Sequence, residues 1–246
     1  MRSMIIHIPN TLTILNILAG CLSIASASRE LWDIAVVWII LATILDFLDG
    51  FAARLLNAYS SIGGQLDSLA DMVSFGIAPA FLLYKNFYGL YAGDFDVQDH
   101  LLLSFANTMT IYLPFTLTVA AALRLAKFNM DTRQHDYFLG LPTPAMAIFF
   151  ASSVYVFRYT PSVKYIEFLD APVFWIILML VFSLLMIAEL KMFAIKFRNL
   201  SWSDNKFQYL FVGISVILLV LLQEISIPII VVVYIVLSSF YHLPAL

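Results

Sequence analysis

The sequence is poor in cysteine and in charge, and each scarcity excludes a class of protein. Cys21 is the one cysteine among 246 residues, so no internal disulfide framework can form. Charged residues make up 12% of the chain and hydrophobic residues 62%, which is far from the balance of a soluble globular domain. No cluster of cysteine and histidine, no P-loop and no GxSxG motif occurs. We therefore expect one integral membrane domain over residues 1–246.

Long apolar runs fill most of the chain and predict transmembrane helices, each of which needs about 20 apolar residues. Residues 1–10 include Arg2, His7 and Pro9, and predict a short interfacial helix that breaks at the proline. The remaining runs predict about eight spans, at 11–28, 31–54, 64–90, 103–127, 143–160, 171–195, 207–222 and 226–243. The expected fold is all-α.

The first apolar run invites comparison with a secretory signal peptide, because Ala25, Ser26 and Ala27 resemble a cleavage site. A signal peptide has a basic leading region and an uninterrupted apolar run. Here one arginine precedes the run, and Asn16 and Gly20 interrupt it. We therefore expect a retained transmembrane helix.

The distribution of basic residues predicts the orientation. With eight spans, one set of ends and loops holds nine basic residues: Arg2, Arg54, Arg124, Lys127, Arg133, Lys191, Lys196, Arg198 and Lys206. The opposite set holds Arg29, Lys85, Arg158 and Lys164. Because cytoplasmic loops carry the excess of lysine and arginine, both termini are expected in the cytoplasm, in a multi-pass protein of the plasma or inner membrane.

Four aspartates lie within or beside these apolar segments. An aspartate at the centre of a spanning helix costs about 2.5–3.5 kcal/mol, so four need compensation. Asp46 and Asp49 are three residues apart, Asp67 and Asp71 are four apart, and each pair falls on one helix face. The short link 55–62 makes the two segments an antiparallel hairpin, so the four carboxylates converge. Oxygen ligands at this density suit a hard divalent cation, and we expect two Mg²⁺ or Mn²⁺ ions.

The aspartates admit two other interpretations. Acidic pairs on a helix are often a solvated face, but the run VVWIILATILDFLDGFAA is too apolar for one. Carboxylates within a membrane also mark cation pathways in coupled transporters. The residues between the pairs argue against transport: Gly50 and Gly63 allow close approach of a ligand, and Arg54 offers a planar fork of donors for phosphate oxygens. Metal, arginine and glycines together indicate a diphosphate site.

The pattern D-x2-D-G-x2-A-R-x8-G-x3-D-x3-D is complete, at Asp46, Asp49, Gly50, Ala53, Arg54, Gly63, Asp67 and Asp71. It resembles the signature of the CDP-alcohol phosphotransferases. The segments RLLNAYSSIGGQLDSLADMVSFGIAPA, ALRLAKFN and FLGLPTPAMA are similar to those of the membrane-type phosphatidylserine synthases within that family. The resemblance implies a catalytic six-helix core at 11–195, with two additional C-terminal helices at 207–243, and a homodimer.

The resemblance also implies roles for residues. CDP-diacylglycerol would be bound by Asn10, Thr11, Gly50, Ala53, Arg54, Ser60 and Gly63, and Asp71 would accept the proton of the acceptor hydroxyl. For Ser60 a phosphate contact or a helix cap is expected. Arg124, Lys127 and Asn129 would bind L-serine, although Lys127 could equally be a basic anchor at the membrane surface. The expected products are phosphatidylserine and CMP, formed by direct displacement, with glycerol 3-phosphate and inositol phosphate as alternative acceptors. Membrane lipids are expected partners and nucleic acids are not.

Overall fold

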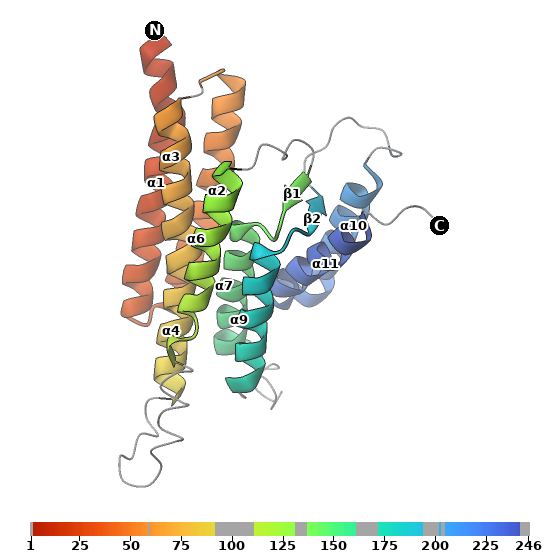
Figure 1. The fold of residues 1–246 in the computed structure, drawn as a ribbon. Coiled ribbons are helices and arrows are strands. Elements are labelled where there is room, and N and C mark those ends of the chain that lie inside the picture. The colour runs from red at the N-terminus through yellow and green to blue at the C-terminus, as the bar shows by residue number, and fades with distance from the viewer. Residues whose placement is uncertain are drawn as a thin grey trace.

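The computed structural model describes residues 2–58, 60–91, 111–130, 137–160, 172–193, 202 and 205–241. In chain order its helices are α1 (Arg2–Ser28), α2 (Trp32–Leu55), α3 (Ser61–Asp71), the π-helix η1 (Met72–Ile77), α4 (Ala78–Tyr91), α6 (Phe115–Met130), α7 (Thr143–Tyr159), α9 (Pro172–Ile187), α10 (Lys206–Leu222), the 3-10 turn η3 (Gln223–Ile225) and α11 (Ser226–Tyr241). Figure 1 shows α1 to α9 running roughly along one direction, with α10 and α11 inclined to them.

Apolar length and exposure agree with a membrane protein. Among the described residues, four helical segments are long and apolar enough to cross a bilayer: His7–Ser28, Trp32–Leu55, Ser61–Leu90 and Lys206–Tyr241. The last comprises α10 and α11, which turn at η3. Large apolar side chains such as Val37, Leu184 and Val220 are 60%, 69% and 74% exposed, which suits contact with lipid. These four segments are fewer than the eight spans expected, and part of the expected span 103–127 lies outside the described residues.

The break predicted at Pro9 is wrong. Helix α1 continues through this residue from Arg2 to Ser28. A proline inside a helix removes one backbone hydrogen bond, because it has no N–H to donate to the carbonyl four residues earlier. Packing of α1 against α2 and α3 offsets this cost.

The expected helix at 171–195 is too long, because α9 ends at Ile187 and a strand follows. Strands β1 (Tyr137–Leu139) and β2 (Lys191–Phe193) pair antiparallel, with Phe138 opposite Met192. The expected all-helical fold is confirmed, and a short two-stranded ribbon stands beside the helices. Its strands come from segments about 50 residues apart, so neither segment alone reveals the pairing.

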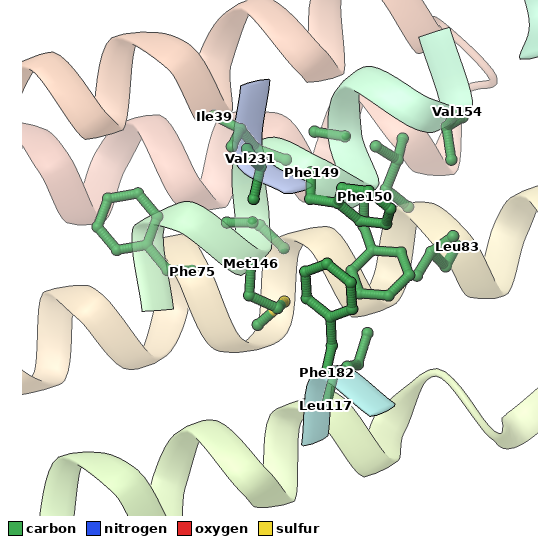
Figure 2. Packing of buried hydrophobic residues seen from close by; sticks show 14 of the residues in the cluster. Ile39, Phe75, Leu83, Leu117, Met146, Phe149, Phe150, Val154, Phe182 and Val231 are labelled. Carbon is green, nitrogen blue, oxygen red and sulfur yellow. The ribbon is translucent and has the colours of Figure 1, made fainter. Parts of the chain in front are cut away.

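Helix α7 lies at the centre of the hydrophobic core. Figure 2 shows its Met146, Phe149, Phe150 and Val154 among side chains from the surrounding helices. The rings of Phe149 and Phe182 of α9 are stacked, with centroids 4.3 Å apart. Figure 2 also places side chains of α2, η1, α4, α6 and α11 in this cluster, so the C-terminal helix is part of the core.

Small and hydroxyl-bearing residues let α1 approach its neighbours closely. The Ser23 hydroxyl donates to the Ala35 carbonyl of α2 at 2.8 Å, and the Ser74 hydroxyl of η1 donates to the Asn16 carbonyl at 2.9 Å. A Cβ atom at Gly20 would lie 2.5 Å from Ser74 Oγ and 2.9 Å from its Cα. The close crossing of α1 and η1 therefore requires glycine at this position. This crossing fixes how α1 lies along its neighbours, and so where its residues near the aspartates stand.

Candidate active site

The aspartates predicted from the motif meet at one end of the α2–α3 hairpin. Asp46 and Asp49 lie near the end of α2, and Asp67 lies in α3. Each of these three offers a carboxylate oxygen, and these oxygens lie within 4.8 Å of one another. Asp71, the last residue of α3, lines the same cavity as Asp46. Its Oδ1 is buried and has no hydrogen-bond partner.

The donor set fits a divalent cation. It consists only of carboxylate oxygens, the ligands that Mg²⁺ and Mn²⁺ prefer. Within the described part of the chain no lysine or arginine forms an ion pair with an aspartate of this cluster. Carboxylates so close together repel one another unless a proton or a cation is shared. A metal ion held by Asp46, Asp49 and Asp67, with Asp71 beside them, would remove that repulsion.

Thr13 orients one of the carboxylates and was not among the residues selected from the sequence. Its hydroxyl donates to Asp49 Oδ2 at 2.6 Å, and both residues are buried. Thr11, which was selected, is exposed, and its hydroxyl donates to the His7 carbonyl at 2.8 Å. Successive residues of a helix differ by about 100° in direction, and Thr13 shares a face with Asn10, three residues earlier. That spacing was the signal that could have distinguished Thr13 from Thr11.

A cavity of about 280 Å³ opens from the aspartates toward α1. Six of the seven residues predicted to bind CDP-diacylglycerol line it: Asn10, Gly50, Ala53, Arg54, Ser60 and Gly63. Ser60 is the N-cap of α3, and its hydroxyl accepts from the Gly63 amide at 2.9 Å. A Cβ atom at Gly63 would lie 2.8 Å from Ser60 Oγ and 2.9 Å from Asn10 Oδ1. Gly63 therefore gives α1 and α3 the room to form this wall.

A second cavity, of about 490 Å³, extends from the aspartates toward α6 and the start of α7. It shares Asp49, Gly50, Arg54, Gly64 and Asp67 with the first cavity. The residues found only in the second are Asp46, Phe47, Ser68, Asp71, Arg124, Leu125, Phe128, Asn129, Pro142 and Pro144. The aspartate cluster thus lies where the two cavities meet.

Arg124 supplies positive charge to the second cavity. Its side chain is buried, with 7% of the residue exposed. Its Nη1 donates to the Thr143 hydroxyl at 3.4 Å, and the guanidinium stands over the Phe128 ring, 5.8 Å from the centroid. The Nε atom is buried without a hydrogen-bond partner. A buried donor without a partner is costly, so Nε is available to donate to a hydrogen-bond acceptor that enters the cavity.

The other two residues predicted to bind serine differ from each other in position. Asn129 lines the second cavity, and its amide donates to the Ser68 hydroxyl at 2.9 Å, which links α6 to α3. Lys127 lines neither cavity. Its amine donates to the Ile187 carbonyl at 3.3 Å, at the C-terminus of α9, where a cation complements the helix dipole. Thr143, the partner of Arg124, was missed, although it lies in the segment FLGLPTPAMA.

Comparison with known families matches residues 6–195 to the CDP-alcohol phosphatidyltransferase family. The match covers most of the chain, so the protein belongs to this family, and the resemblance read from the aspartate motif is confirmed. Helices α10 and α11 lie beyond the matched region.

The chain is similar to curated relatives that are each named CDP-diacylglycerol–serine O-phosphatidyltransferase. The relative from Bacillus subtilis is 38% identical over 138 residues, which cover 56% of this chain and 70% of the relative. The relative from Methanocaldococcus jannaschii is 36% identical over 144 residues, covering 58% of each chain. The relative from Mycobacterium tuberculosis strain H37Rv is 36% identical over 148 residues, covering 57% of this chain. The match spans 46% of that longer relative.

Proposed function

We propose that the protein transfers the phosphatidyl group of CDP-diacylglycerol to the hydroxyl of L-serine, giving phosphatidylserine and CMP. The observation that carries the proposal is the position of the aspartate cluster between two cavities, one with Arg54 and glycines and the other with the unpaired Nε of Arg124. The names of the relatives support serine as the acceptor.

The first cavity would bind the nucleotide end of CDP-diacylglycerol. Arg54 would donate to the diphosphate, and Gly50 and Gly63 leave room for it beside α1 and α3. Asp46, Asp49, Asp67 and Asp71 would hold Mg²⁺ or Mn²⁺, in our proposal two ions. When bound, the metal supplies the positive charge that phosphoryl transfer requires at the diphosphate oxygens.

The second cavity would bind serine. Arg124 would donate from Nε to the serine carboxylate, and Asn129 would contribute its amide near the Ser68 hydroxyl. A phosphorylated acceptor such as glycerol 3-phosphate or inositol phosphate carries more negative charge. Among the described residues, the basic side chains that line this cavity are Arg124 and Arg54. Because Arg54 is assigned to the diphosphate, the guanidinium of Arg124 remains for the acceptor. One guanidinium suits the single negative charge of the serine carboxylate.

Asp71 would act as the base. Its buried Oδ1 has no hydrogen-bond partner and is therefore available to accept the proton of the serine hydroxyl. The serine oxygen forms a bond to the phosphorus that carries the diacylglycerol, the bond from that phosphorus to CMP breaks, and the proton goes to Asp71. The transfer is a direct displacement without a covalent enzyme intermediate.

We also propose that the active site and both termini face the cytoplasm and that the chain spans the membrane eight times. The excess of basic residues at this end of the molecule supports the orientation. Helices α10 and α11 have 17 and 16 residues, about 25 Å each at 1.5 Å per residue, so each crosses most of the hydrocarbon core. The family resemblance supports a homodimer, which sedimentation in detergent would test.

The proposed function is tested by measuring CMP release from CDP-diacylglycerol by the purified protein with Mg²⁺ or Mn²⁺. We expect release that requires serine and is lost on removal of the metal. Asp71→Asn is expected to lower kcat about 10²- to 10⁴-fold, the usual contribution of a general base, without change in the thermal midpoint. Release only with glycerol 3-phosphate would overturn the choice of acceptor. No release with any acceptor, but ion flux in sealed vesicles, would instead favour a transporter.

A further inference from the structure

Helix α11 lies outside the region matched to the family, yet it contacts the ribbon that leads to the second cavity. Tyr234 of α11 is 4% exposed. Its ring packs edge-on against Phe193 of β2, with centroids 5.0 Å apart, and against Phe211 of α10 at 5.8 Å. Its hydroxyl donates to the Phe193 carbonyl at 3.1 Å. Tyr234 therefore holds the ribbon both by its ring and by its hydroxyl.

The ribbon connects Phe193 to Thr143, the residue that accepts a hydrogen bond from Arg124. Phe193 is paired with Tyr137 of β1, and β1 leads through Gly140 and Leu141 to the start of α7. The segment after β1 is tightly held, because the Gly140 amide donates to the Leu190 carbonyl at 2.8 Å and the Leu141 amide to the Leu185 carbonyl at 2.9 Å.

The held segment ends at Thr143, which is fully buried and accepts from Arg124 Nη1. The path from Tyr234 to Arg124 thus consists of hydrogen bonds and a short stretch of fixed backbone. Tyr234 lines neither cavity, so its effect on the site is argued through Thr143 alone.

We propose that Tyr234 is a positioning residue for the acceptor: by fixing β2, and through it Thr143, it holds the Arg124 guanidinium where the anionic group of the acceptor binds. The inference rests on the proposed function, and it gives the C-terminal helix pair a role in recognising the acceptor. The CDP-diacylglycerol side, formed by α1, α2 and α3, is independent of this path.

Tyr234→Phe tests the proposal, because it keeps the ring and removes only the hydroxyl. We expect the KM for serine to rise about threefold to tenfold, the factor that one hydrogen bond is typically worth, while kcat and the KM for CDP-diacylglycerol stay within about twofold. Tyr155→Phe is the matched control, since Tyr155 lies in α7 against Tyr159 and away from both cavities. The control is expected to leave all three constants unchanged.

Thr143→Val provides a second, independent measurement. If Tyr234 acts through Thr143, this variant also raises the KM for serine, and the double variant raises it by less than the product of the two single effects. Multiplicative effects would overturn the path. An unchanged KM for serine in Tyr234→Phe, or an equal rise in both KM values, would overturn the proposal.

The wild-type protein separates this inference from the proposed function. If it releases CMP with glycerol 3-phosphate and not with serine, the proposed acceptor is wrong. In that case we expect Tyr234→Phe to raise the KM for glycerol 3-phosphate instead, because Arg124 would bind the anionic group of that acceptor. If no acceptor supports CMP release, both the function and the role of Tyr234 are overturned.

Discussion

Thr13 joins the first helix to the aspartate cluster through one short hydrogen bond. The hydroxyl donates its single proton to Asp49 Oδ2 at 2.6 Å, and its oxygen lies 3.0 Å from the Pro9 carbonyl oxygen. A carboxylate that binds metal is held in orientation by such outer contacts, and losing one typically weakens metal binding about 10- to 100-fold. Thr13 would therefore act through Asp49 on a metal ion bound at the cluster.

Thr13→Val keeps the shape of the side chain and removes the hydroxyl. We expect the concentration of Mg²⁺ or Mn²⁺ that gives half-maximal CMP release to rise about 10- to 100-fold, with most of the activity recovered at saturating metal. Thr11→Val is the matched control, because Thr11 is exposed and bonds only the His7 carbonyl. Equal metal requirements in the two variants would contradict the role assigned to Thr13.

At the scale of elements, the junction of α1 with α3 depends on Gly63. Its neighbour Gly64 has no atom within 4 Å of the place where a Cβ would stand, whereas a Cβ at Gly63 would meet Ser60 and Asn10. The two adjacent glycines thus differ in the space around them, although the sequence presents them alike.

Gly63→Ala is expected to raise the KM for CDP-diacylglycerol about fivefold or more, because overpacking typically costs about 1 to 3 kcal/mol and here displaces two residues of the nucleotide cavity. The KM for serine is expected to change little. Steady-state kinetics with each substrate varied in turn make the measurement. Gly64→Ala is the control, and a similar rise in that variant would argue against the steric explanation.

The element that joins β1 to α7 depends on a different glycine. Gly140 has a φ of +75°, a left-handed conformation that favours glycine. A Cβ there would also collide with the carbonyl oxygen of Met186 and lie 3.0 Å from that of Ala188. Both constraints follow from the close passage of this segment over the end of α9.

Gly140→Ala is expected to lower the free energy of unfolding by roughly 1 to 3 kcal/mol, seen as a lower thermal midpoint in detergent. Gly213→Ala is the control. Gly213 lies within α10 with open space around it, and alanine is the better helix former by up to about 1 kcal/mol. A Gly140→Ala protein with an unchanged midpoint would show that the segment can relax away from α9.

At the scale of the whole molecule, the two ends of the helix bundle differ in charge and in chemistry. The aspartates, Arg54 and Arg124 lie at the end where α2 finishes. At the opposite end Arg158 of α7 donates to Asn86 of α4 at 2.7 Å, and its guanidinium stands over the Trp32 ring, 4.5 Å from the centroid. These contacts tie α2, α4 and α7 together far from the aspartates.

The orientation can be measured with single cysteines, because the chain has one cysteine, Cys21, and it is exposed on α1. In a Cys21→Ser background, Gln65→Cys marks the aspartate end and Arg29→Cys the opposite end. In sealed right-side-out vesicles we expect an impermeant maleimide to label the Arg29→Cys protein and not the Gln65→Cys protein. After permeabilisation we expect it to label both proteins. The reverse pattern would place the aspartates outside.

The aspartate hairpin could be predicted from the sequence because its geometry is local. Asp46, Asp49, Asp67 and Asp71 are related by helical spacing and one short link, so their convergence follows from 3.6 residues per turn. The family followed from the same 26 residues. Thr13 was within reach of the same reasoning, since it shares a helix face with Asn10.

The acceptor side could not be predicted to the same depth, because it is assembled from distant segments. Arg124 meets Thr143, 19 residues further along the chain, β1 pairs with β2 over about 50 residues, and Tyr234 of α11 contacts Phe193. No spacing rule relates these positions. Lys127 shows the same limit: its residue type suits serine binding, but its place on α6 directs it to the end of α9.

The two cavities leave the aspartate cluster in different directions, one toward α1 and the other toward α6 and α7. An incoming hydroxyl from the second and a departing CMP in the first would stand on opposite sides of the phosphorus. A displacement with this arrangement inverts the configuration of that atom. A CDP-diacylglycerol made chiral at the reacting phosphorus would therefore give a product of the opposite hand, as a single displacement requires.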